Sequence, residues 1–239
     1  MINHVEYSHA FQPIIDIDAG RVVSYEVLLR GKNNEPPGAI FGQIPKERLM
    51  NFDQASRERA IKLAANLGLE CNLNLNFTPG SILFESGKYV EDTVAAAQKQ
   101  GVEAKQLILE ITESEVINTT SAFVNVLNKL RRTGLTIAID DFGAGYAGLN
   151  LLADVQPDLI KLDMHLLRGI DKNGARQSIV KAISDVCLDL GIDVLAEGVE
   201  TKEEFGFLKK QGIVLYQGYF FAKPGFECLP SVSTQYLEA

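Results

Sequence analysis

Short β-branched or leucine-rich stretches alternate with stretches of helical periodicity along this 239-residue chain. Stretches with the composition of strands occur at residues 10–16, 22–29, 72–77, 107–112, 136–142, 158–163, 193–199 and 215–221. Apart from the first two, consecutive strand candidates are separated by segments of helical period, which we place at 47–66, 88–100, 119–133, 147–154, 174–190 and 201–211. Such alternation is typical of a parallel sheet whose strands are connected by helices.

The number and spacing of the strands predict one α/β domain over residues 1–239. No Pro/Gly/Ser-rich linker and no shift in composition divides the chain. We predict a modified TIM (β/α)8 barrel, a fold of about 250 residues, with an open doubly wound sheet as the alternative. The turn DIDAGR at 16–21 joins the first two strands tightly, so the first hairpin is expected to be irregular and partly antiparallel.

Several helix ends carry their own signals. Thr119, Thr120 and Ser121 offer an N-cap, and Gly134 and Gly191 stand where a C-cap glycine belongs. Thr201 is followed three residues later by Glu204, the spacing of a capping box. The helix boundaries are therefore specified locally.

Composition excludes several classes of protein. The formal net charge of −8 argues against a partner that is polymeric nucleic acid, because such a partner needs a basic surface. No apolar run approaches the roughly 18 residues of a spanning helix, and the N-terminus lacks a secretory signal, so we expect no membrane insertion and a cytoplasmic location. Cys71, Cys187 and Cys228 form no C-x-x-C pair and are expected to be reduced thiols.

Polar side chains recur near the C-terminal ends of the predicted strands: Glu26, Asn76, Glu110, Asp140, Asp141, Lys161, Glu197 and Gln217. Singly, each has an ordinary explanation as a solvated charge or a turn cap. In a barrel, however, these strand ends meet at one mouth, so residues far apart in the sequence would face one another. The recurrence on seven strands predicts a functional site at that mouth.

The crowded carboxylates predict divalent cations. Acidic groups in one volume repel one another and raise their own pKa values unless cations are present. The chain has only His4, His9 and His165, so the ligands would be oxygen atoms, which favours Mg²⁺ or Mn²⁺ over zinc. Adjacent Asp140 and Asp141 could bridge two ions, an arrangement suited to displacement at phosphorus.

Lys161 and the glycine-rich segment 143–148 each allow more than one interpretation. Lys161 would hold or polarise an attacking water and stabilise charge on phosphate, or else act as a structural partner of Asp163. Residues 143–148, GAGYAG, fit the dinucleotide-binding pattern G-x-G-x-x-G, which makes an oxidoreductase a further hypothesis. Two carboxylates directly before the first glycine disfavour that interpretation. His165, beside Asp163, is assigned no role.

The chain resembles the EAL-domain family of cyclic di-GMP phosphodiesterases. The resemblance rests on FQPII (11–15), YEVLLR (25–30), LNFTP (75–79), LEITES (109–114), IDDFGAGYAGL (139–149), PDLIKLD (157–163), AEGVET (196–201) and QGYFFAKP (217–224). It implies a modified TIM barrel and a hydrolase that uses two divalent cations, Mg²⁺ or Mn²⁺, to open cyclic di-GMP to linear pGpG. Ca²⁺ is expected to inhibit. It further implies a homodimer through the DDFG-loop region and a possible regulatory domain or partner.

The resemblance also implies roles for single residues. It assigns Glu26, Asn76, Glu110 and Asp140 to a first metal ion, with Asp140 shared, and Asp141 and Glu197 to a second. The implied catalytic residues are Lys161, Glu26 and Asp141, and the implied substrate-binding residues are Gln12, Arg30 and Gln217. Supporting roles fall to Glu113, which would steady the DDFG loop, and to Asp163 and Glu200.

The departures from the family pattern are mild. Val27 replaces the alanine beside Glu26, and Ala144, Ala147 and Gly148 replace loop hydroxyls. None removes an implied ligand, so they are expected to affect the rate more than the identity of the reaction. A catalytically weak cyclic di-GMP receptor or interaction module on the same fold is the alternative function.

Overall fold

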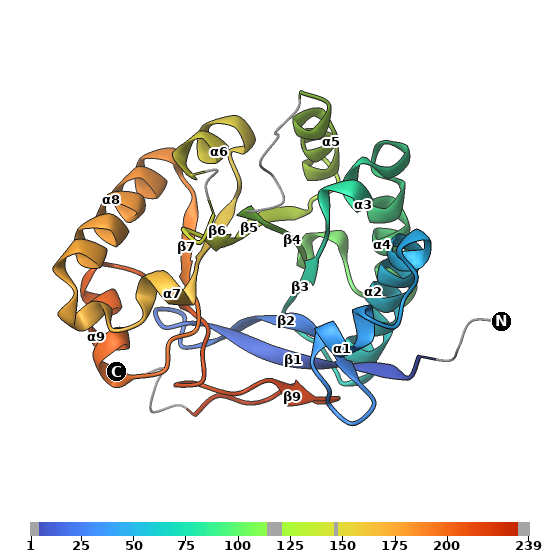
Figure 1. Cartoon of the computed structure of the whole chain (residues 1–239), viewed down its shortest axis with the longest axis horizontal. Coiled ribbons are helices and arrows are strands. Elements are labelled where there is room, and N and C mark those ends of the chain that lie inside the picture. The colour runs from blue at the N-terminus through green and yellow to red at the C-terminus, as the bar shows by residue number, and fades with distance from the viewer. Residues whose placement is uncertain (1–4, 114–120, 146–147, 234–239) are drawn as a thin grey trace.

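The computed structural model describes residues 5–113, 121–145 and 148–233 (Figure 1). Within these segments the strands close into a barrel in the order β2, β3, β4, β5, β6, β7, β8, β1, because β1 pairs with both β8 and β2. The strands are β1 Tyr7–Asp16, β2 Arg21–Gly31, β3 Asn72–Asn76, β4 Leu107–Thr112, β5 Thr136–Phe142, β6 Leu159–Leu162, β7 Asp193–Ala196 and β8 Leu215–Tyr216. The predicted barrel is confirmed.

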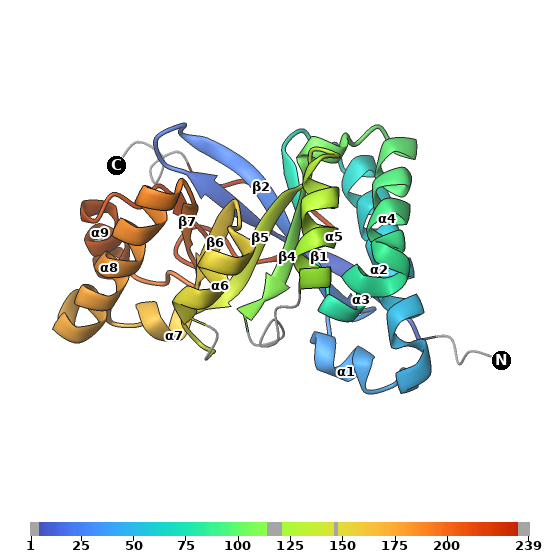
Figure 2. The same ribbon diagram turned by 90° about the horizontal axis from the view of Figure 1, so that it is seen from above.

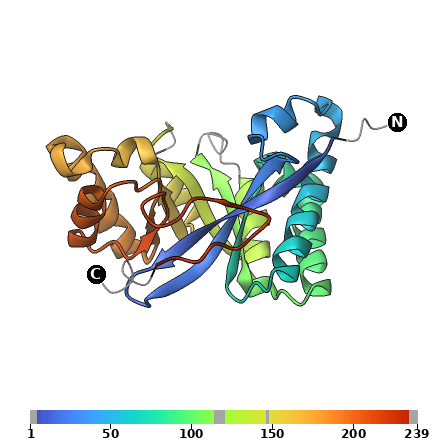
Figure 3. The ribbon, with the colours of Figure 1, turned by 90° about the horizontal axis from the view of Figure 1, so that it is seen from below.

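The first hairpin is irregular, as predicted. β1 runs antiparallel to β2 and to β8, whereas the pairs from β2 through β8 are parallel. A register shift interrupts the β1–β2 ladder between Ile14 and Ile15. A two-residue strand, β9 (Gly225–Phe226), pairs with β1 and lies along the hairpin in the view from below (Figure 3). The sequence did not predict β9, because two residues are too few to show a strand period.

The six predicted helices are all present, with ends shifted by no more than a few residues. They are α2 Leu49–Asn66, α4 Lys88–Lys99, α5 Ser121–Arg131, α6 Gly148–Val155, α8 Gly174–Leu190 and α9 Lys202–Lys210. Three short helices were not predicted, namely α1 Pro37–Phe41, α3 Pro79–Leu83 and α7 Met164–Leu167. Short 3₁₀ turns occur at Lys46–Arg48, Phe84–Ser86, Ala104–Gln106 and Ile170–Lys172. The helices lie around the outside of β3–β7 (Figures 1 and 2).

The helix caps predicted from the sequence are present where they fall within the described residues. Gly191 is the left-handed C-cap of α8, and Gly134 is left-handed in the turn after α5. The capping box of α9 is complete, since Thr201 and Glu204 each bond the other's backbone N–H. Thr119 and Thr120 lie outside the described residues. None of the helices in the described segments combines the length and the apolar character needed to cross a bilayer.

Buried apolar side chains form two layers. One layer packs the outer faces of the strands against the helices and includes Leu75, Leu109, Ile139 and Leu162. The other is a separate cluster of Ile14, Ile108, Ala138, Leu159 and Leu195, contributed by five different strands. Since successive side chains on a strand point to opposite faces, this second cluster fills the interior of the barrel. It forms an apolar floor beneath the mouth.

Candidate active site

A polar layer lies directly above the apolar floor. Moving two residues along a strand returns to the same face, so the residue two positions from each floor residue, on the side of the mouth, also points into the barrel. This relation connects Ile108 to Glu110, Ala138 to Asp140, Leu159 to Lys161 and Leu195 to Glu197, and on the antiparallel strand it connects Ile14 to Gln12. The pleat of the strands therefore brings polar side chains that are far apart in the sequence into one ring above the floor.

Lys161 lies at the centre of this ring and is fully buried. Its Nζ is 2.7 Å from Glu197 Oε1, 2.9 Å from Glu110 Oε1, 3.0 Å from Asp140 Oδ1 and 3.4 Å from Glu26 Oε2. The carboxylate of Asp163, the alternative partner considered from the sequence, instead accepts a hydrogen bond from the backbone N–H of His165 at 2.8 Å. One ammonium group thus faces four carboxylates.

The ring contains four carboxylates and one ammonium group, and this excess of acidic groups shifts the pKa values of its members. Burial alone would lower the pKa of Lys161, but the surrounding carboxylates raise it well above its ordinary value. Burial raises the pKa of Glu110 to about 8, and the charges of Glu26 and Asp140 add to this although Lys161 opposes it. Burial likewise raises the pKa of Glu197. A site with more carboxylates than cations favours the binding of further positive charge.

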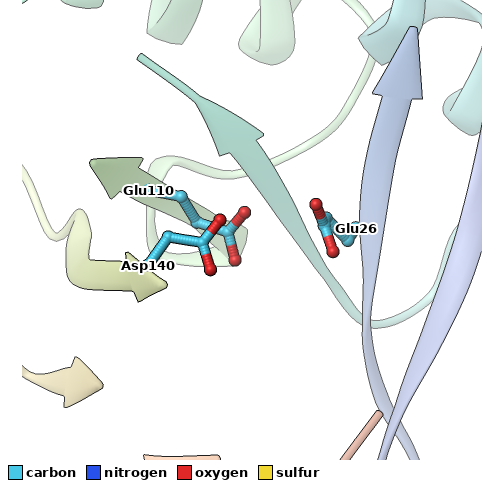
Figure 4. Close-up of side chains that lie close together, drawn as sticks. All are labelled: Glu26, Glu110 and Asp140. Atoms are coloured by element: carbon cyan, nitrogen blue, oxygen red, sulfur yellow. The ribbon is translucent and has the colours of Figure 1, made fainter. Parts of the chain in front are cut away.

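The geometry of the carboxylates fits divalent cations. Glu26, Glu110 and Asp140 each offer an oxygen, and these oxygens lie within 4.8 Å of one another; the side chains converge in Figure 4. Asp140, Asp141 and Glu197 form a second such group. Carboxylate oxygens are the ligands that hard divalent ions prefer. The two groups share Asp140, so the residues present could hold divalent cations on either side of this carboxylate.

A break in the β5 strand brings Asp140 and Asp141 to the same place. Adjacent side chains on a regular strand point in opposite directions. Here the β5–β6 register shifts between Ile139 and Phe142, and Asp141 adopts a left-handed backbone with φ of +54°. This conformation is uncommon for a residue with a side chain and is a form of strain often found at functional sites. Burial, together with the charges of Asp140 and Asp163, raises the pKa of Asp141 to about 6.

Glu113 holds the loop that follows Asp141. Its carboxylate accepts hydrogen bonds from the backbone N–H groups of Gly143 at 2.8 Å, Gly145 at 3.1 Å and Gly148 at 2.8 Å. A side chain at Gly145 would meet this carboxylate, because an added Cβ would lie 3.0 Å from Glu113 Cδ. The buried carboxylate therefore ties the start of α6 to the end of β4.

If the chain hydrolyses cyclic di-GMP, as its family motifs imply, replacing Glu113 with alanine should lower the rate by about 10- to 100-fold, the range typical of outer-shell groups at metal sites. The loop would lose three hydrogen bonds and with them the position of Asp141. Glutamine keeps only one acceptor oxygen and should fall between alanine and the wild type. Steady-state turnover at saturating Mn²⁺ measures the effect, and equal rates for the alanine variant and the wild type would contradict the positioning role.

A cavity of about 490 Å³ opens beside the ring. Its lining includes Glu26, Asp141, Glu197 and Gln217 together with Asp163, His165, Glu200 and Tyr219. Seven of the predicted site residues therefore line a single cavity, namely Gln12, Glu26, Asp141, Asp163, Glu197, Glu200 and Gln217. Glu26, Glu110, Asp140, Lys161 and Glu197 meet as anticipated from their strand-end positions.

The predicted substrate-binding residues do not all share this cavity. Gln217 donates to Glu26 Oε2 at 2.7 Å and to Gln12 Oε1 at 3.4 Å, so both glutamines lie in the ring. Arg30 is half-buried and donates to the neighbouring carbonyl of Leu29 at 2.8 Å, outside the cavity wall. Asn76 is exposed at the end of β3, where it pairs in register with Glu110. The roles assigned to Arg30 and Asn76 stay predictions.

Two residues with clear contacts in the site escaped the sequence analysis. Asn74 is fully buried and donates to Glu110 Oε1 at 2.8 Å; its position two residues before Asn76 in NLNLN was the available signal. Arg168 pairs with Glu200 at 2.8 Å and carried no comparable signal, since it follows α7. Val27, expected beside Glu26, instead packs in the layer between strands and helices, on the opposite face of β2.

A closed α/β barrel with two overlapping carboxylate groups and a buried lysine at its mouth defines this chain as a barrel protein with a candidate divalent-metal site. The chain belongs to the EAL domain family, whose profile matches residues 1–224. These observations confirm the resemblance drawn from the sequence motifs.

Curated relatives include regulators and enzymes. The blue light- and temperature-regulated antirepressor BluF of Escherichia coli (strain K12) is 36% identical over 226 residues, which cover 94% of this chain and 56% of BluF. The cyclic di-GMP phosphodiesterase PA2567 of Pseudomonas aeruginosa is 32% identical over 220 residues, which cover 90% of this chain and 38% of PA2567. The chain thus spans about half, or less, of the length of these relatives.

Solved structures share the fold closely. A standalone EAL protein from Vibrio cholerae O395, in its c-di-GMP bound form, has a TM-score of 0.92 and 41% identity, and the match covers 99% of each chain. BlrP1 of Klebsiella pneumoniae, in a manganese and cyclic di-GMP complex, has a TM-score of 0.90 and 39% identity, covering 96% of this chain and 59% of BlrP1.

Proposed function

We propose that the chain hydrolyses cyclic di-GMP to linear pGpG with the help of two divalent cations, Mg²⁺ or Mn²⁺. The observation that carries this proposal is the shared carboxylate of Asp140, which belongs to both groups of converging oxygens beside Lys161. The phosphodiesterase PA2567 and the cyclic di-GMP complexes of related structures support the choice of substrate.

The proposed ligands divide between two ions. Glu26, Asn76, Glu110 and Asp140 would hold the first, and Asp140, Asp141 and Glu197 the second. Bound there, the ions would activate water and stabilise charge on the phosphate during in-line displacement. The ammonium of Lys161, fixed among the carboxylates, would orient the attacking water and stabilise negative charge in the transition state.

The remaining residues would bind and position the substrate. Gln12 and Gln217 form a hydrogen-bonded pair at the edge of the ring, where their amides can contact the sugar or phosphate. Arg30 carries a permanent charge suited to a phosphate oxygen. Glu113 would hold the Asp141 loop, while Asp163 and Glu200 line the cavity.

Product analysis tests the proposal directly. The purified protein, incubated with cyclic di-GMP and either Mn²⁺ or Mg²⁺, is expected to release pGpG, identified by chromatography against a pGpG standard. Ca²⁺ should occupy the same carboxylates yet support little turnover, because its larger shell adopts a looser geometry. Absence of pGpG with all three ions would contradict the proposal, and equal rates in Ca²⁺ and Mn²⁺ would contradict the mechanism.

A second candidate function is a cyclic di-GMP receptor that regulates a protein partner. The similarity to the antirepressor BluF favours this candidate. It predicts binding of cyclic di-GMP without product at saturating Mn²⁺. The retention of Glu26, Asp140, Lys161 and Glu197 in one ring supports the enzyme instead.

We further propose that residues 1–239 act as one domain in the cytoplasm and form a homodimer through the DDFG-loop region, with regulation by a further domain or partner. Sedimentation of the wild-type chain with and without cyclic di-GMP would measure the oligomeric state.

A further inference from the structure

His165 is fixed between the two loops that carry the proposed metal ligands. On one side Met164 packs against Gly198, where an added Cβ would lie 2.5 Å from the Met164 Cβ. On the other side Leu166 packs against Gly143, where an added Cβ would lie 3.1 Å from Leu166 Cδ2. The short α7 turn is thus wedged between the loop after Asp141 and the loop after Glu197. His165, between the two packed residues, lines the cavity.

Asp163 orients the ring of His165. Its Oδ1 accepts from the His165 backbone N–H at 2.8 Å and lies 3.0 Å from the ring Nδ1. A carboxylate can only accept from a ring nitrogen, so Nδ1 carries the hydrogen in this contact. The Asp163 side chain is buried, with 7% exposed, whereas 84% of the His165 side chain is exposed. Nε2 of His165 is therefore left for a ligand, and it can donate to that ligand when the ring is protonated.

The charge of the cavity indicates what that ligand group is. Glu26, Asp141, Asp163, Glu197 and Glu200 all line the cavity, and among the described lining residues His165 is the one whose side chain can carry positive charge. Arg168, on the same connection, is already paired with Glu200. An anionic group of a ligand in this part of the cavity could accept a charge-assisted hydrogen bond from His165.

Resting on the proposed function, we propose that the protonated ring of His165 donates from Nε2 to a phosphate oxygen of the bound cyclic dinucleotide, at the phosphate that is not cleaved. A cyclic dinucleotide carries two phosphates. The proposed ions and Lys161 would contact the cleaved phosphate at the buried ring of carboxylates, whereas the side chain of His165, which also lines the cavity, is 84% exposed. His165 is thus a substrate-binding residue that affects the affinity for the substrate. The cleavage step depends instead on Lys161 and the carboxylates around it.

Binding and turnover of His165 variants test this inference. For His165→Ala we expect the Kd for cyclic di-GMP, measured by calorimetry in Ca²⁺, and the KM in Mn²⁺ to rise about five- to tenfold. The kcat should stay within about twofold, because the contact is the same in the ground and transition states. His165→Arg restores a cationic donor and should keep Kd and KM within about twofold of the wild type.

Lys172→Ala is the matched control. Lys172 lies on the same connection after β6, its side chain is 85% exposed, and it does not line the cavity, so its loss removes one positive charge without a ligand contact. Unchanged Kd in His165→Ala, an equal loss in Lys172→Ala, or failure of arginine to restore affinity would overturn the role of His165 alone. A wild type that does not bind cyclic di-GMP would overturn the proposed function together with this inference.

Discussion

Replacing Lys161 with methionine is expected to reduce hydrolysis of cyclic di-GMP on the order of a thousandfold or more, the size of loss seen when a preorganised electrostatic group is removed. Methionine fills a similar volume but leaves Glu26, Glu110, Asp140 and Glu197 without their shared ammonium group. Turnover at saturating Mn²⁺ measures the loss.

The same variant should change stability in a way that depends on metal. Without divalent ions, the unpaired buried carboxylates are expected to lower the free energy of unfolding by about 3 kcal/mol. Added Mn²⁺ should raise the melting temperature of the variant more than that of the wild type, because the ions then supply the missing positive charge. Lys181→Met removes a lysine from an exposed pair with Asp185 and should leave both measurements unchanged. A variant that melts like the wild type without metal would refute the central role of Lys161.

Replacing Glu110 with glutamine should also abolish most turnover, again on the order of a thousandfold, because the first group of oxygens loses a charged ligand. Its effect on stability is expected to be opposite to that of Lys161→Met. Glu110 is fully buried and its pKa is raised to about 8, so folding must either bury its charge or add a proton to it, and a neutral amide avoids both costs.

Metal-free Glu110→Gln is therefore expected to melt at the same temperature as the wild type or higher, with a smaller stabilisation by Mn²⁺. Glu91→Gln, which alters an exposed pair with Lys129, serves as the control for loss of one carboxylate. Wild-type turnover in the Glu110 variant would contradict the proposed ligand set. A Mn²⁺ stabilisation equal to that of the wild type would show that the ions bind elsewhere.

The sequence predicted the parts of the fold that repeat. The barrel order follows from strands that alternate with helices of at least eight residues, and the ring follows from polar residues at the strand ends. The short elements β9, α1 and α7 lie outside the longer strand and helix patterns of the sequence and were missed. The antiparallel first hairpin was expected because a six-residue turn leaves no room for a helix.

The contacts within the site were less accessible from sequence. Glu113 was placed on its loop by the family motif, and its bonds to Gly143, Gly145 and Gly148 are now visible in the structure. The placement of Asp141 depends on a left-handed backbone, which no local pattern specifies. The position of His165 depends on glycines in two other loops, so only the assembled barrel reveals it.

The apolar floor formed by Ile14, Ile108, Ala138, Leu159 and Leu195 determines from which end of the barrel a ligand can enter. Because buried aliphatic side chains close the lower end of the barrel, the proposed ions and nucleotide would enter and leave through the mouth. A nucleotide bound there would hinder exchange of the ions. We expect the cations to load first and to exchange only after the product has departed.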